Sequence, residues 1–162
     1  MGCDIHVFIE KKTDEKYNIW EQVALYRVGK YGRQLETADP YDGRNYSLFG
    51  LLAGVRGWMD PLIEPRGLPS NLSEGVEKEE RWWEQSYHTP TWYDLSELYL
   101  YRKMYKSYIR KDESLQEEER AEAYGSFVYF VDCIEHYLDL AQEWTWGDIA
   151  PSKYRVIMWF DS

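Results

Sequence analysis

The stretch that decides the fold is MGCDIHVFIE, residues 1–10 at the start of the chain. Side chains alternate between the two faces of a β-strand. The odd positions are all apolar and predict a buried face: Cys3, Ile5, Val7 and Ile9. The even positions form an opposite, more polar face: Asp4, His6, Phe8 and Glu10. On that face Asp4 and His6 lie side by side and can converge on a metal, a phosphate or a proton. The alternative is a half-exposed strand with incidental polar residues.

Hydrophobic periodicity and turn residues predict the other elements. The strands are expected at 3–11 and 17–24, as an antiparallel hairpin, and at 154–160, where the chain closes. The helices are expected at 74–85 behind a Ser73 cap, at 92–110, at 121–143, and in a short apolar segment that Asn45 or Ser47 caps. Between them lie a long loop at 29–44, a connector at 86–95 and a charged link at 111–120.

This order of elements predicts an α+β fold. The expected sheet is small, mostly antiparallel and includes both chain termini, with the helices packed on one of its faces. The 162 residues are enough for one domain, 1–162, with a core that needs no disulfides. The apolar helical positions predict this core: Leu48, Phe49, Leu52, Phe127, Phe130, Ile134 and Leu138.

Composition narrows the possible partners and compartments. The formal net charge of −10 makes a nucleic-acid backbone a poor partner, and it is explained better by solubility than by DNA mimicry. Cys3 and Cys133 fit no disulfide framework and no CxxC metal motif. We expect no membrane span, because no run of about 18 apolar residues occurs, and no secretion signal. The expected compartment is therefore the cytoplasm.

One candidate site gathers histidines and carboxylates. If the closing strand pairs antiparallel beside the first, Asp161 comes close to Cys3 or Asp4. His88 can then meet His6 over the sheet, although a solvent-exposed connector residue is an equal alternative. We predict Asp4, His6 and His88 as catalytic residues and, together with Asp161, as ligands of a divalent metal. These ligands come from distant segments, so no spacing rule supports them, and motifs such as HExxH are absent.

A second candidate site consists of arginines in Gly- and Pro-rich loops beside the apolar helix. Arg44, Arg56 and Arg66 suit phosphate or carboxylate recognition, because the guanidinium group is a planar fork of donors. The alternative is ion pairing with nearby carboxylates: Asp42, Asp60 and Glu64. Tryptophans flank the same loops and suit a stacked base: Trp58, Trp82, Trp83 and Trp92. The predicted ligand-binding set is Arg44, Arg56, Arg66, Trp58, Trp92 and Glu10.

Several motifs together resemble a family of small bacteriophage and prophage proteins. They are the opening MGCDIH, the segment YSLFGLLAGVR followed by RGLP, the connector HTPTW and the closing WFD. No such motif occurs between about 102 and 146. The resemblance implies action in the cytoplasm of an infected bacterium, and small phage proteins often counter host defence. It implies no specific activity.

Three functions remain open from the sequence. The first is capture of a small nucleotide-like ligand, such as an immune signal, with the arginines holding phosphate. The second is a phosphoester hydrolase in which Asp4, His6 and His88 bind a metal or transfer protons. The third is an acidic, protein-binding inhibitor or DNA mimic. A homo-oligomer is compatible with each of them.

Overall fold

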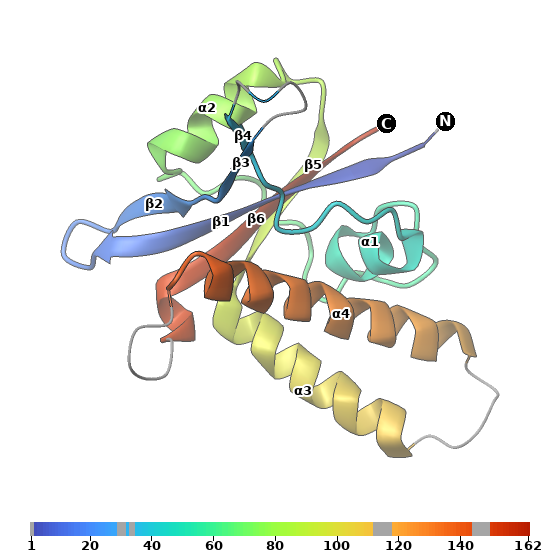
Figure 1. Cartoon of the computed structure of the whole chain (residues 1–162). Coiled ribbons are helices and arrows are strands. Elements are labelled where there is room, and N and C mark those ends of the chain that lie inside the picture. Colours follow the sequence, from blue (N-terminus) through green and yellow to red (C-terminus); the bar gives the residue numbers. More distant parts are fainter. Residues whose placement is uncertain (1, 29–31, 33–34, 112–117, 144–149) are drawn as a thin grey trace.

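The computed structural model describes residues 2–28, 32, 35–111, 118–143 and 150–162 (Figure 1). The strands are β1 (Asp4–Asp14), β2 (Ile19–Val23), β3 (Tyr26–Val28), β4 (Leu35–Thr37), β5 (His88–Asp94) and β6 (Tyr154–Asp161). The helices are α1 (Tyr46–Ala53), α2 (Glu74–Trp82), α3 (Leu95–Lys111), α4 (Glu118–Leu140) and the short 3₁₀ helix η2 (Pro151–Lys153). None of the described helices is long and apolar enough to cross a membrane.

The first and last strands form the centre of the main sheet. Its strand order is β2-β1-β6-β5, with every neighbouring pair antiparallel. Asp4 pairs with Asp161 and Ile9 with Val156, so the two chain ends lie at the same end of the sheet (Figure 1). The pairing of β2 with β1 begins only at Ile9 and Val23. Among the strands that the structure describes, the first half of β1 is therefore paired on one side alone.

The two faces of β1 are those that the alternation predicts. Ile5 and Val7 are buried in the main core, which they share with α1, α3 and α4 below the sheet in Figure 1. The predicted helical core is confirmed, because all of its members are fully buried in this cluster: Leu48, Phe49, Leu52, Phe127, Phe130, Ile134 and Leu138. On the opposite face Phe8 packs against Ile157, Trp159 and Val76 of α2 in a second, smaller core.

The predicted α+β class with both termini in an antiparallel sheet is confirmed. Helices α1, α3 and α4 share one face, while α2 covers part of the other (Figure 1). Side-chain caps place the starts of two helices where the sequence predicts them. The side chain of Asn45 accepts a hydrogen bond from Leu48 N at 3.0 Å, and Ser73 Oγ accepts one from Val76 N at 3.3 Å.

Two segments differ from the prediction. The connector at 86–95 contains strand β5, which pairs with β6, and α3 begins after it at Leu95. Thr89 and Pro90 fall within an irregularity of that pairing, because proline lacks the N–H that a regular ladder requires. The loop at 29–44 is shorter than predicted, since Leu35–Thr37 pairs with Tyr26–Val28. Most of the charged link at 111–120 lies outside the described residues.

Candidate functional site

The centre of the candidate site is the His6 imidazole on the polar face of β1. Its Nε2 lies 2.9 Å from Asp161 Oδ2 on β6, and the other carboxylate oxygen of Asp161 accepts a hydrogen bond from Asp4 N at 3.3 Å. The ring also packs against Trp83, with 4.1 Å between ring centroids. Among the described residues, only Nε2 of this ring has a hydrogen-bond partner. An aspartate at one nitrogen fixes the ring orientation and leaves the other nitrogen available for a ligand or a proton.

His6 lines a cavity of about 310 Å³. Its floor follows residues 6–9 of β1, and Gln22 and Val23 of β2 bound one end. The segment 37–40, at the end of β4, forms one wall, and Glu79 and Trp82 of α2 form another together with the C-cap residue Trp83. This volume is in the range of small-molecule sites, which are concave and carry a few convergent polar groups.

Two carboxyl groups of the cavity have perturbed acidities. Burial, followed by the nearby Asp39 carboxylate, raises the pKa of Glu79 above its ordinary value of 4.5, and His6 lowers it in part. Asp39 keeps much of its surface exposed at the cavity rim, but partial burial and then Asp42 raise its pKa above 3.8. The cavity therefore holds an oriented imidazole together with two carboxyl groups that bind protons more readily than usual.

The arginines of the predicted phosphate site do not form one cluster. Arg44 lies at the N-terminal end of β1, where its Nε donates to Asp4 Oδ1 at 2.8 Å in a half-exposed ion pair. Asp4 raises the pKa of Arg44 through this hydrogen bond. Arg56 is exposed, with its guanidinium 6.0 Å from the Tyr46 ring. Burial raises the pKa of the Cys3 thiol, and the positive charges of Arg56 and Arg44 partly oppose this, which places both guanidinium groups at the same end of the sheet.

Arg66 lies apart from Arg44 and Arg56 and has a structural role. It binds Glu97 of α3 through two hydrogen bonds, of 2.9 and 2.7 Å, and donates a third to Trp92 O. Its guanidinium also lies over the Trp92 ring at 4.5 Å. The ion-pair alternative for this arginine therefore holds, with a partner on a distant helix. Arg66 and Trp92 join β5 to α3, and neither residue lines the cavity.

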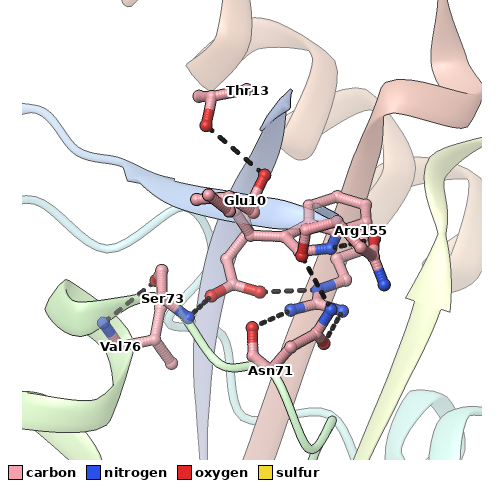
Figure 2. Close-up of polar contacts among 9 residues, drawn as sticks. Glu10, Thr13, Asn71, Ser73, Val76 and Arg155 are labelled. Carbon is pink, nitrogen blue, oxygen red and sulfur yellow. Dashed lines mark hydrogen bonds and ion pairs between the residues drawn. The ribbon is translucent and has the colours of Figure 1, made fainter. Parts of the chain in front are cut away.

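Glu10 is also structural, which corrects its prediction as a ligand-binding residue. Its carboxylate is fully buried and accepts hydrogen bonds from Arg155 Nε at 2.6 Å and from Ser73 N at 2.6 Å. Arg155 in turn donates to the side chain and backbone oxygens of Asn71 (Figure 2). Because Ser73 is the N-cap of α2, this buried network anchors the helix that supplies a wall of the cavity.

The histidines do not converge on one point. His88 pairs with Phe160 and lies over its ring, so it faces the main core, on the side of the sheet opposite His6. Its ring nitrogens bond to Thr89 Oγ1 and Ser162 Oγ. Within the described parts of the chain, no group of three histidine, cysteine or acidic side chains is placed to hold a metal ion. Trp58 of the predicted ligand set is exposed and lies outside the cavity.

The sequence prediction missed Asp39 and Glu79. Glu79 is one of several acidic residues on a charged helix, and Asp39 lies in the long loop, so neither has a distinguishing pattern. The pair Trp82-Trp83 at the end of α2 is the one sequence signal for this wall, because adjacent tryptophans at a helix end are costly to leave in water unless they have a binding or packing role.

The chain matches no protein-family model. Neither the curated proteins nor the solved structures contain a match to it. The resemblance of its motifs to bacteriophage proteins therefore stays a prediction, and the functional argument rests on the geometry of the site.

Proposed function

We propose that the protein binds and sequesters a small phosphate-bearing, nucleotide-like ligand in the cavity beside His6. The observation that carries the proposal is the cavity itself, which has a ligand-sized volume next to an aspartate-oriented histidine and two tryptophans. Aromatic walls suit a heterocyclic base, since every base has a face on which it can stack. Following the resemblance to phage proteins, we infer that such capture would remove a host immune signal inside an infected bacterium.

The phosphate would bind at Arg44 and not within the cavity. Asp39 and Glu79 make the cavity unfavourable for an anion. Arg44 is held by Asp4, which lies two residues from His6 on the same face of β1, a spacing of roughly 7 Å along a strand. The ion pair is half exposed, so a phosphate dianion can compete with the Asp4 carboxylate for the guanidinium fork.

Calorimetric titration with a panel of linear and cyclic nucleotides tests this proposal. Wild-type protein should bind at least one member, and Arg44→Gln should weaken the binding about tenfold through loss of a charged hydrogen bond. Arg81→Gln is the matched control, because Arg81 is also exposed and ion-paired, but its partner is Glu77 of α2 and not Asp4 of β1. Absence of binding at millimolar nucleotide, or equal loss in both variants, would refute the proposal.

A phosphoester hydrolase is the second candidate, and the His6–Asp161 pair specifically favours it. An imidazole that donates from Nε2 to a carboxylate has Nδ1 free to accept the proton of an attacking water. A metal-dependent form has less support, because the described residues do not assemble a ligand set.

Chromatography of the nucleotide after incubation separates the two functions. A hydrolase would release a cleaved product, and His6→Ala would abolish turnover while Arg44 still holds the phosphate. A sequestering protein would release the ligand intact after denaturation, and His6→Ala would change the affinity alone. Metal analysis of the purified protein accompanies this assay, since stoichiometric metal together with a cleaved product would support the metal-dependent enzyme.

A further inference from the structure

The cavity lies along an open backbone edge of β1. It touches four consecutive residues, 6–9, whose side chains alternate between both faces of the sheet. Its other lining residues come from both sides of the sheet, with Tyr137 of α4 on the main-core side and Trp83 at the end of α2 on the other, so the cavity lies along the side of the strand. It lies in the fork where β2 separates from β1, next to the Ile9–Val23 pair at which their pairing ends.

The edge at residues 5–7 carries hydrogen-bonding groups that the sheet does not use. These residues pair with β6 on one side, and on the other side no backbone hydrogen bond from the described segments reaches them. In an antiparallel ladder every second residue presents its N–H and C=O to a given edge. The cavity floor therefore offers a backbone N–H donor and a C=O acceptor. Their spacing and direction are fixed, because β1 is a central strand of the sheet.

The two walls of the cavity supply acceptors. Glu79 enters from α2 and Asp39 from the segment that follows β4. Carboxylate oxygens accept hydrogen bonds from exocyclic amino groups of bases, as they do from cytosine N4 in nucleic-acid recognition. A ligand lying between the two sides would meet backbone groups along one edge and carboxyl groups along another, with Trp82 and Trp83 nearby.

We propose that this cavity reads the base of the ligand and selects amino-bearing heterocycles, such as adenine, cytosine or guanine, over bases that lack the amino group. The β1 backbone edge pairs with the donor–acceptor edge of the base, and Glu79 or Asp39 accepts from the amino group. This inference rests on the proposed nucleotide binding and adds which bases the site prefers.

The competing occupant of an open strand edge is an extended peptide that adds a strand. A base fits better here, because the segment 37–40 and the end of α2 stand on either side of the floor and close the space to about 310 Å³. An added strand needs a long accessible edge, whereas β1 is open only ahead of its pairing with β2.

The decisive experiment compares ligands that differ by one amino group. Guanosine is titrated against inosine, and adenosine against purine riboside, by calorimetry on the full chain. In at least one pair the amino-bearing nucleoside should bind about tenfold to a hundredfold more tightly, which is the range for a hydrogen bond to a charged group. Glu79→Gln or Asp39→Asn should remove that preference. Glu74→Gln should keep it, because Glu74 lies on the same helix with its side chain 86% exposed and outside this cavity.

Hydrogen exchange of β1 amides gives the second readout. The preferred nucleoside should slow exchange at the open-edge amides within residues 5–7, which no other described backbone group protects. Nucleotide binding without amino-group discrimination and without this protection would overturn the inference and leave the proposed function standing. Protection by an extended peptide but by no nucleoside would overturn it in favour of strand addition. No binding of any nucleotide or nucleoside would overturn both.

Discussion

Glu10→Ala should destabilise the fold by about 3–5 kcal/mol, the usual effect of removing one partner from a buried ion pair. The Glu10 side chain is 0% exposed and that of Arg155 5%, so the guanidinium left behind cannot regain water without opening the structure. The substitution also leaves the buried Ser73 N–H without its acceptor at the start of α2. Because a domain is stabilised by only about 5–15 kcal/mol, the loss is a large part of the total.

Urea unfolding followed by circular dichroism measures this change. The midpoint should fall with little change in slope, and the melting temperature should drop by about 6–20 °C for a chain of this size. Glu74→Ala is the matched control: Glu74 forms an exposed pair with Lys78, and its loss should change the stability by no more than about 0.5 kcal/mol.

A double variant tests whether the destabilisation comes from the unpaired charge of Arg155 or from the lost packing. Glu10→Met with Arg155→Met removes both charges, so it should be less destabilised than Glu10→Ala, because no unpaired charge stays buried. If Glu10→Ala costs less than about 1 kcal/mol, or no more than Glu74→Ala, the network is not the anchor of α2 that the structure indicates.

Three further predictions test the core and the charged groups. Leu52→Ala should cost about 2–5 kcal/mol in urea unfolding, because Leu52 is fully buried, whereas the exposed Leu100→Ala should cost far less. Arg66→Ala should cost about 1.5–3 kcal/mol at pH 7 without changing nucleotide affinity. Burial raises the pKa of Glu97, but hydrogen bonds from Arg66 and from Asp94 N more than offset this and hold it below 4.5, so the stabilisation from Arg66 should fade as the pH falls below 4.5. Glu79→Gln should stabilise the protein at pH 7 but not at pH 4: burial raises the pKa of Glu79, so its penalty develops as the pH rises above 4.5. Thermal melts at the two pH values measure this difference.

The strands with clean alternation could be predicted from the sequence, and strand β5 could not. In β1 the apolar odd positions identify the buried face, and its pairing with β6 follows from placing both chain ends in one sheet. Strand β5 contains Thr89-Pro90, which indicates a break in regular structure when it is read locally. Its pairing with β6 outweighs that local preference, and the irregularity accommodates the proline.

Part of the candidate site could likewise be predicted from the sequence, and part of it could not. The placement of His6 on the polar face follows from strand alternation, and the pairing of β1 with β6 brings its Nε2 to 2.9 Å from Asp161. Glu10 shares that face with His6, but alternation cannot show that Arg155 and Ser73 bury it farther along the strand. The pairing of Arg66 with Glu97 joins residues that only the folded chain brings together, so the loop composition around Arg66 misled the prediction.

The most direct test of the account is an NMR titration of the isotope-labelled protein with the nucleotide that binds best in calorimetry. The account predicts that the His6 imidazole and the Trp83 indole resonances shift together and saturate at one ligand per chain, while His88, on the opposite face of the sheet, is unaffected. Saturable shifts at His88 with none at His6 and Trp83 would contradict it, as would the absence of any shift at millimolar ligand.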